Sequence, residues 1–590
     1  MSPQVRSERH DRAPQASGGE LVAEVLLRHG VRFLFTLCGG HISPILAAAK
    51  ARGVRVVDTR HEATAVFAAD AVARLTGTPG VAAVTAGPGV TNALTALQNA
   101  RLAQTPIVLL GGATATVLRG RGALQDVDQI ALASPAVKRA LRVGKLRDLV
   151  PALEEAFAVA REGVPGPVFV ECPVDLLYPE SVVRGWYASK ADAPAGFVAR
   201  ATRWYLERHL DALFAGVEGT DPRKPAPVAL PRPEAGSVGT AAFLLGRSAR
   251  PVLLLGSGAL LAPAEADDLA RAVRALGLPV FLSGMARGLL GPASPLQCRH
   301  RRTNALREAD LVLLAGVPCD FRLDYGRQIG RSAAVISANR DSAARSLNRR
   351  PTLGVGGDPG FFLRDLSDAV PGGFPRPEWL ARLRERDAAR DAEISAAPDG
   401  ERGALDPVAL CRSLEESLPE DGLVVADGGD FVATASYVLR PRAPLSWLDP
   451  GVFGTLGVGA GFALGAALCR PGAPVLLLWG DGSAGYGLVE IDTFVRHGLG
   501  VVAVIGNDAA WTQIAREQVE VLGDDVGTVL RTTDYYAAAR GLGGEGLLLD
   551  DPARRRTVLA EAFGLARAGR PVVVDARLGK TAFRKGSISI

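Results

Sequence analysis

The chain has 590 residues, of which 48% are hydrophobic and 22% charged, and its formal net charge is +5. This length exceeds what one hydrophobic core supports and predicts about three or four domains. The net charge is small for the length and no compact run of Lys and Arg alternates with aromatic residues, which argues against a nucleic-acid-binding protein.

Residues 1–17 are polar and charged without an apolar stretch, so we expect a disordered tail and no signal peptide. From residue 18 onward, short β-branched strands alternate with helices rich in Ala and Leu. The expected strands are 31–37, 54–58, 81–85, 107–110 and 168–171, and the expected helices are 20–29, 63–75 and 91–102. This alternation predicts a parallel sheet covered on both faces, in a first domain at residues 18–187.

Two further α/β blocks follow. A linker at 188–240, rich in Pro and charge at 221–236, leads to a second domain at 241–372 with apolar runs at 251–255 and 311–315. A second linker, 373–403, carries a charged helix and leads to a third domain at 404–590. The third domain has expected strands at 423–426, 475–479, 501–505 and 572–576 and helices at 462–469 and 488–497. The predicted fold class is therefore α/β, with three doubly wound parallel-sheet domains in series.

The third domain contains a candidate metal and phosphate site. Gly480-Asp481-Gly482-Ser483 follows one predicted strand, and Asn507 follows the next. Asp481 and Asn507 each offer an oxygen, and Mg²⁺ takes such ligands together with phosphate oxygens. Ligands bind at the carboxyl ends of strands in open α/β sheets. The same tripeptide is also common in ordinary strand-to-helix turns, so other motifs must decide between the two interpretations.

Other motifs agree with the first interpretation. The spacing from Gly480 to Asn507 is similar to the thiamine-diphosphate fingerprint. Arg60-His61-Glu62 and the stretch 84–92 resemble the pyrimidine-binding half of the acetolactate synthase, oxalyl-CoA decarboxylase and 2-hydroxyacyl-CoA lyase superfamily. The resemblance runs from about residue 18 onward and includes 122–126, 447–450 and 454–457. It implies pyrimidine-binding, central Rossmann-like and diphosphate-binding domains, with thiamine diphosphate and Mg²⁺ as cofactors.

The resemblance implies catalytic roles for three residues of the first domain. Glu62 matches the glutamate that bonds the cofactor's aminopyrimidine. The alternative is a surface glutamate at a helix start with no catalytic role, stabilised by the helix dipole. Gln125 matches a glutamine that faces the reacting carbon. His41, in the first strand-to-helix loop, is a candidate proton donor near the thiazolium, or else a structural loop histidine.

The third domain is expected to hold the cofactor. Leu456 matches the bulky residue that separates the two rings of the cofactor, although it could equally be a core residue, and the Gly454 carbonyl would accept from the 4′-amino group. Backbone donors for the diphosphate are expected in two loops, at Gly429, Asp430, Phe431, Gly480, Gly482 and Ser483. Mg²⁺ would be bound by Asp481, Asn507 and the carbonyl of Ala509, with Asp508 where many relatives have a second Asn.

The reaction is less constrained by these motifs. The segment 507–518 departs from the acetolactate synthase pattern, and with Gly39-Gly40-His41 and the ending 583–588 the chain looks closest to the acetolactate-synthase-like 2-hydroxyacyl-CoA lyases. Such an enzyme would cleave a 2-hydroxyacyl-CoA to formyl-CoA and an aldehyde or ketone that is one carbon shorter, or run the reverse condensation. The alternatives are an acetolactate synthase-type carboligase acting on pyruvate and a non-catalytic subunit that binds thiamine diphosphate.

Partners and location complete the prediction. The substrate would be an acyl-CoA, with a 2-oxo acid as the alternative, and Arg299–Arg302 and Arg340 are candidate CoA contacts. FAD or ADP is possible in the central domain, where Gly256-Ser257-Gly258 follows a strand but Leu261 replaces the third glycine of the dinucleotide motif. The resemblance implies a homodimer or homotetramer whose active site lies between chains. Six scattered cysteines and apolar runs too short to span a membrane fit a cytoplasmic protein.

Overall fold

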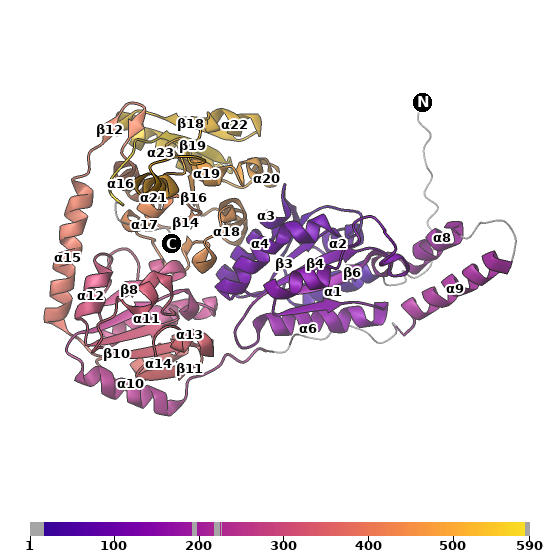
Figure 1. The fold of residues 1–590 in the computed structure, drawn as a ribbon, viewed down its shortest axis with the longest axis horizontal. Helices are drawn as coiled ribbons and strands as arrows, with labels where there is room; N and C mark the ends of the chain where they lie inside the picture. The colour runs from indigo at the N-terminus through magenta and orange to yellow at the C-terminus, as the bar shows by residue number, and fades with distance from the viewer. Residues whose placement is uncertain (1–16, 191–196, 217–224, 226, 585–590) are drawn as a thin grey trace.

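A computed structural model describes residues 17–190, 197–216, 225 and 227–584. The predicted N-terminal tail, part of the proline-rich stretch and the chain end from residue 585 lie outside the described residues. The described chain is built around three parallel sheets with helices between the strands, which confirms the predicted fold class (Figure 1).

The N-terminal domain has a sheet of order β2-β1-β3-β4-β6-β5. Its strands are β1 (Phe33–Leu37), β2 (Arg55–Asp58), β3 (Gly80–Val84), β4 (Ile107–Ala113), β5 (Arg139–Arg142) and β6 (Val168–Pro173). Its main helices are α1 (Gly18–Arg28), α2 (Ser43–Ala51), α3 (Glu62–Thr76), α4 (Pro88–Ala103) and α6 (Leu149–Arg161). Helix α3 begins after His61, whose Nδ1 accepts from the Ala63 N–H at 3.1 Å, and ends at Gly77 with φ of 75°.

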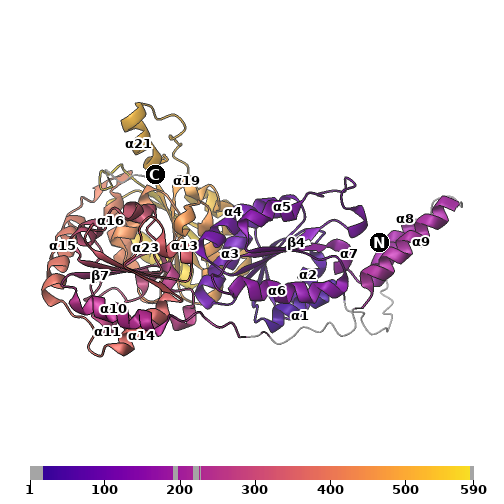
Figure 2. The same ribbon diagram turned by 60° about the horizontal axis from the view of Figure 1, so that its bottom comes forward.

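The central domain has a sheet of order β11-β10-β9-β7-β8. Its strands are β7 (Pro251–Leu255), β8 (Val280–Leu282), β9 (Leu311–Ala315), β10 (Ala334–Asn339) and β11 (Leu353–Gly356), and its helices include α10 (Ala235–Arg247), α11 (Ala266–Leu276), α12 (Arg302–Glu308) and α14 (Pro359–Ala369). The segment predicted as a linker at 188–240 contains a long helix, α9 (Phe197–Phe214). Together with α8 (Glu180–Lys190), α9 projects from the N-terminal domain away from the other two domains (Figures 1 and 2).

The C-terminal domain follows the long helix α15 (Pro377–Ser395) and has a sheet of order β15-β14-β16-β17-β19-β18. Its strands are β14 (Leu423–Ala426), β15 (Trp447–Leu448), β16 (Val475–Gly480), β17 (Val501–Asn507), β18 (Glu545–Leu549) and β19 (Val572–Arg577). Its helices include α16 (Pro407–Ser417), α17 (Asp430–Val438), α18 (Val458–Cys469), α21 (Thr512–Leu522) and α23 (Arg555–Arg567). The helix predicted at 488–497 is a 3₁₀ turn, Leu488–Glu490, followed by α20 (Ile491–His497).

The N-terminal and C-terminal domains meet through α3 and α18, which lie side by side (Figure 1). The contact is close because α18 presents glycines to α3. A Cβ atom added at Gly461 would lie 2.5 Å from the Phe67 Cβ, and one at Gly465 would lie 2.5 Å from the Ala68 carbonyl oxygen. Phe67 and Phe462 pack edge to face beside these glycines, with ring centroids 6.0 Å apart.

Each sheet has a point where two adjacent strands are followed by crossovers that lead in opposite directions. These points lie between β1 and β3, between β7 and β9, and between β14 and β16. Ligands in open α/β sheets bind outside the carboxyl ends of the strands at such a point. The topology therefore marks three places to search for a site. Within the part of the chain that the structure describes, no helix has the length and apolarity needed to cross a bilayer.

Candidate functional site

A cavity of about 500 Å³ lies at the carboxyl ends of β14 and β16. It is lined by the loops that follow these strands and by residues after β17, among them Gly429, Asp430, Asp481, Gly482, Ser483 and Leu456. The cavity therefore occupies the point in the C-terminal sheet where the strand order reverses.

Asp481 and Asn507 end neighbouring parallel strands, as predicted, because Gly480 of β16 pairs with Gly506 of β17. Both side chains are buried, with exposed fractions of 4% and 3%. Among the described residues, the Asp481 Oδ2 and the Asn507 Oδ1 have no hydrogen-bond partner. A buried oxygen without a donor is costly, so these two oxygens at the ends of adjacent strands suit the binding of a cation.

The orientation of Asn507 is determined by its other side-chain atom. Its Nδ2 donates to the Thr533 carbonyl and to the Asp575 Oδ1, both at 2.9 Å. Both amide hydrogens are thereby used, so the Oδ1 is presented as an acceptor only. Burial raises the pKa of the Asp575 carboxyl. Asp575 thus fixes the orientation of Asn507, the predicted metal ligand, and the sequence analysis did not identify this contact.

The electrostatics of Asp481 also fit a cation. Burial, with the neighbouring charge of Asp508 as the next cause, raises the pKa of the Asp481 carboxyl to about 7. Burial likewise raises the pKa of Asp508, whose Oδ2 accepts from the Thr512 hydroxyl at 2.5 Å. Two enclosed carboxyl groups share the cavity wall, and a divalent ion beside them would favour the ionised form of Asp481.

The third predicted metal ligand, Ala509, has a left-handed backbone with φ of 53°. Its carbonyl oxygen accepts from the Leu530 N–H at 2.8 Å. A carbonyl oxygen has two lone pairs, so this bond leaves one available. The role of Ala509 stays a prediction.

The phosphate end of the cavity is built from close backbone approaches. Gly429 has φ of 114° and lies directly before α17, which begins at Asp430. A Cβ atom at Gly482 would lie 2.5 Å from the ring of Trp511. The Ser483 hydroxyl donates to the Gly428 carbonyl at 3.0 Å and so ties the two loops together. Two loops with backbone N–H groups at helix starts suit an anion.

Asp430 forms ion pairs with two arginine side chains at the same end of the cavity. Its carboxylate lies 2.6 Å from the Arg516 guanidinium and 3.2 Å from that of Arg584. Both arginines are mostly buried, with side-chain exposures of 17% and 9%. The Asp430 side chain is therefore held by these arginines, which leaves its backbone N–H as the group that could face a phosphate.

The residues predicted for catalysis gather at the reversal point of the N-terminal sheet. Glu62 is 6% exposed, and its Oε2 accepts from the Asn92 Nδ2 at 3.0 Å. Gln125 has φ of 64°, and a Cβ atom at Gly87 would lie 2.9 Å from the Gln125 Cβ. His41 follows β1, and its Nδ1 lies 3.2 Å from the Thr85 hydroxyl after β3.

The protonation of His41 does not favour the predicted role of proton donor. Burial lowers the pKa of its imidazole below the usual value, so the neutral form predominates at neutral pH. In that form one ring nitrogen donates and the other accepts, and the Thr85 hydroxyl can pair with the Nδ1 in either tautomer.

The two groups of candidates do not meet in the cavity beside Asp481, as far as the described residues show. The cavity beside Asp481 is lined by the C-terminal domain and by Arg287 of the central domain. Of the described residues, Glu62, Gln125 and His41 are not among those that line it. Glu62, which is predicted to bond the aminopyrimidine of the cofactor, therefore lies outside the cavity beside Asp481.

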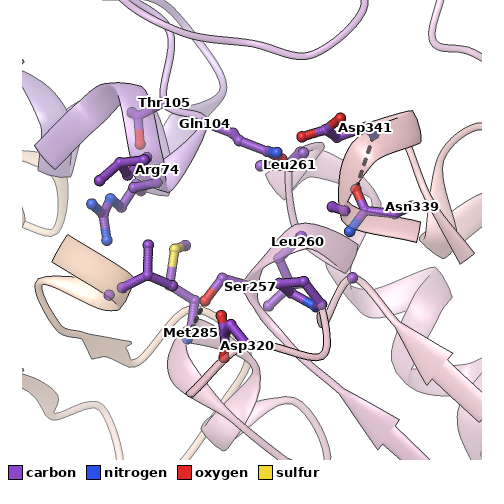
Figure 3. Close-up of a pocket in the computed structure, with 18 of the residues that line it drawn as sticks. Arg74, Gln104, Thr105, Ser257, Leu260, Leu261, Met285, Asp320, Asn339 and Asp341 are labelled. Atoms are coloured by element: carbon purple, nitrogen blue, oxygen red, sulfur yellow. Dashed lines mark hydrogen bonds between the residues drawn. The ribbon is translucent and has the colours of Figure 1, made fainter. Parts of the chain in front are cut away.

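A second cavity, of about 440 Å³, lies at the reversal point of the central sheet (Figure 3). Ser257, Met285, Asp320, Asn339 and Asp341 face it from the central domain, and Arg74, Gln104 and Thr105 face it from the N-terminal domain. The glycines of the weak dinucleotide motif have a packing role here. A Cβ atom at Gly258 would lie 2.9 Å from the Gly316 Cα, so the two loops can approach only without side chains.

The arginines considered for CoA are engaged by the protein itself. Arg340 pairs with Asp358 at 2.6 Å, with side-chain exposures of 1% and 3%. One nitrogen of Arg299 donates to three carbonyls at the end of α17, those of Tyr437, Val438 and Leu439. These contacts correct the suggestion that Arg299 and Arg340 present free charge to a ligand.

Comparison with known proteins places the chain in a class. Three descriptions match in order: "Thiamine pyrophosphate enzyme, N-terminal TPP binding domain" at residues 16–132, the central domain of the same enzymes at 238–366, and their C-terminal TPP binding domain at 427–576. The predicted catalytic residues of the N-terminal domain and the cavity of the C-terminal domain thus both fall in regions that match TPP-binding domains.

Relatives over nearly the full length narrow the assignment. The chain is 52% identical to 2-hydroxyacyl-CoA lyase 2 of Homo sapiens, over 98% of this chain and 93% of the relative. It is 50% identical to the protein of that name in Danio rerio, over 98% and 94%. A probable acetolactate synthase of Mycobacterium bovis is 35% identical over 96% of each chain. The chain belongs to the thiamine pyrophosphate enzyme family that includes 2-hydroxyacyl-CoA lyase 2, which confirms the resemblance inferred from the motifs.

Proposed function

We propose that the chain is a thiamine-diphosphate-dependent lyase that cleaves 2-hydroxyacyl-CoA to formyl-CoA and an aldehyde or ketone that is one carbon shorter, or that catalyses the reverse condensation. The observation that carries this proposal is the pair of buried, unpartnered oxygens on Asp481 and Asn507 at the ends of adjacent strands, in a chain about half identical to the lyase relatives throughout its length. Thiamine diphosphate, when bound, supplies a carbon nucleophile that can add to the thioester carbonyl.

The C-terminal domain would bind the metal and the cofactor. Asp481 and Asn507, with the Ala509 carbonyl, would hold Mg²⁺ against the diphosphate, and the backbone of 429–431, Gly480, Gly482 and Ser483 would bind its oxygens. The Gly454 carbonyl would accept from the 4′-amino group, and Leu456 would separate the two rings of the cofactor. All of these groups belong to the C-terminal domain.

Glu62 would hold a proton at its carboxyl group, next to the pyrimidine ring. The Asn92 Nδ2 bond engages its Oε2, which leaves the Oε1 to face the cofactor. Gln125 can donate to a substrate oxygen without titrating, and the neutral His41 can accept the proton of the 2-hydroxyl group as the carbon-carbon bond breaks. These roles are consistent with the position of all three residues at one edge of the N-terminal sheet.

A complete site needs both groups of residues, so we propose a homodimer or homotetramer in which Glu62 of one chain meets Asp481 of another. The support is that the cavity beside Asp481 is lined without any of the three N-terminal candidates. A cytoplasmic location fits the six free cysteines, of which four are buried.

The cavity of the central domain suits a nucleotide such as ADP or FAD. It lies where doubly wound sheets bind nucleotides, and the carboxylates of Asp320 and Asp341 border it and could accept from ribose hydroxyls (Figure 3). The test is the ligand released from the purified protein on denaturation. A yellow colour with a flavin spectrum identifies FAD, and an adenine spectrum alone identifies ADP.

An acetolactate synthase-type activity on pyruvate is the second candidate, because a relative with that name is 35% identical. The deciding experiment supplies Mg²⁺ and thiamine diphosphate with either a 2-hydroxyacyl-CoA or pyruvate. Formyl-CoA together with a shortened aldehyde or ketone supports the lyase. Acetolactate alone overturns it, and the absence of either product from a protein that binds the cofactor supports a non-catalytic subunit.

A further inference from the structure

Asp427 is an enclosed carboxyl group at the base of the C-terminal cavity. It follows β14 directly and is 4% exposed. Its Oδ1 accepts from the Gly457 N–H at 3.0 Å, and its Oδ2 accepts from the Gly459 N–H at 2.7 Å and from the Trp479 indole N–H at 3.1 Å. One carboxyl group thus receives three donors from two separate segments of the chain.

The two segments are the ones that must be placed relative to each other in the proposed cofactor site. Gly457 directly follows Leu456, and Gly457 and Gly459 lie at the start of α18, where Gly457 has φ of 87°. Trp479 is in β16, two residues before Asp481. Asp427 therefore links the loop of the ring-separating Leu456 to the strand of the metal ligand.

The packing around Leu456 makes this link sensitive to small shifts. A Cβ atom at Gly428 would lie 2.2 Å from the Leu456 Cδ2, so Leu456 rests directly on the backbone that follows Asp427. A Cβ atom at Gly459 would lie 2.6 Å from the Trp479 Nε1 and 2.7 Å from the Asp427 Oδ2. These contacts leave no room for the loop to move toward the sheet.

A carboxyl group is an expensive way to satisfy three donors in a dry environment. Burial raises the pKa of Asp427 to about 7 although all three donors oppose the shift. An apolar side chain in its place would leave three buried donors without an acceptor, and one carboxyl group orients both segments at once.

We propose that Asp427 is a positioning residue for thiamine diphosphate. Asp427 holds the Gly454–Leu456 loop at the distance from Asp481 that the bound cofactor requires. This inference rests on the proposed function for the identity of the cofactor. It concerns the binding of the cofactor and not the substrate.

The test measures binding of thiamine diphosphate, with Mg²⁺ present, by quenching of tryptophan fluorescence in Asp427→Asn. The amide is the same size but turns an NH₂ group toward donors, so we expect the Kd to rise about tenfold or more. Asp175→Asn is the matched control, because Asp175 is also buried and accepts from the Thr116 N–H, the Thr116 hydroxyl and the Tyr187 hydroxyl in the N-terminal domain. It should lower the urea midpoint of unfolding and leave the Kd within twofold.

A double-mutant cycle separates positioning from general destabilisation. Leu456→Ala and Asp427→Asn should weaken binding less than additively when combined. Leu456→Ala already removes the side chain that Asp427 is proposed to position, so the loss of that positioning then costs less. Trp479→Phe deletes a single donor, retains the carboxyl group and should raise the Kd several-fold even if Asp427→Asn does not fold. The inference is overturned if Asp427→Asn has the wild-type Kd or if the two changes in the cycle are fully additive. If Asp427→Asn does not fold, a wild-type Kd in Trp479→Phe overturns it. Failure of the wild-type protein to cleave 2-hydroxyacyl-CoA while it binds the cofactor overturns only the proposed function.

Discussion

Asp481→Asn should make the cofactor-free protein more stable at pH 8 while it removes the metal site. Burial and Asp508 raise the pKa of Asp481 from its ordinary value of 3.8 to about 7. An acid whose pKa is raised by folding binds more protons in the folded state, so its contribution to stability is complete below the unfolded pKa and is lost as the pH rises through the folded pKa.

The size of the effect follows from this shift. At about 1.4 kcal/mol per pKa unit, the raised pKa of Asp481 costs the cofactor-free protein up to about 4 kcal/mol at pH 8, about 2 kcal/mol at pH 5 and almost nothing near pH 3. Asparagine has nearly the same shape and no charge to bury. The variant should therefore exceed the wild-type free energy of unfolding by these amounts, and the difference should shrink as the pH falls.

Urea unfolding at pH 8 and pH 5, without metal or cofactor, measures the difference between the two midpoints. Addition of Mg²⁺ and thiamine diphosphate at about 100 times the wild-type Kd should stabilise the wild-type protein by about 2.7 kcal/mol and the variant by much less. The reasoning is refuted if the variant is less stable than the wild type at pH 8 without cofactor, or if the cofactor and Mg²⁺ stabilise both proteins equally.

Three further predictions concern the proposed active site. Glu62→Gln should lower turnover of 2-hydroxyacyl-CoA by about 10²- to 10⁴-fold, the usual range for a lost proton-transfer group, with little change in the Kd for thiamine diphosphate; retained turnover would contradict the role of Glu62. Gly482→Ala should weaken cofactor binding about tenfold, because its Cβ would lie 2.5 Å from the Trp511 ring; a companion Trp511→Ala change should relieve the clash, and a wild-type Kd in the single variant would show that the loop yields. Equal mixing of Glu62→Gln and Asp481→Asn chains after dissociation should restore about a quarter of wild-type activity, since half of randomly formed dimers would be hybrids with one intact site; no recovery in hybrids that have been shown to form would argue against a site between chains.

The sequence alone determined the fold class and the adjacency of Asp481 and Asn507, the two predicted metal ligands. The alternation of short apolar runs with Ala- and Leu-rich segments is sufficient for parallel sheets, because both faces of such strands are buried. Asp481 and Asn507 could be assigned to adjacent strand ends because they directly follow consecutive apolar runs, and parallel strands place those ends at one edge. Glu62, Gln125 and His41 were found because each lies in or beside a short motif.

The tertiary structure alone identified the supporting residues. Asp575 lies 68 positions from Asn507 along the chain, and Trp479 lies 52 positions from Asp427, so no local pattern relates them. The available hint was a charged residue, Asp427, directly after an apolar run and before two glycines. Whether Arg299 and Arg340 are free for a ligand depends equally on carbonyls and carboxylates that are distant in sequence.

Local sequence therefore specifies which atoms can bind a metal or hold a proton, because these properties belong to side chains and to the ends of strands. The tertiary structure decided which of those atoms have partners. The unpartnered oxygens of Asp481 and Asn507, and the three donors enclosed around Asp427, exist only after distant segments exclude water and compete for hydrogen bonds.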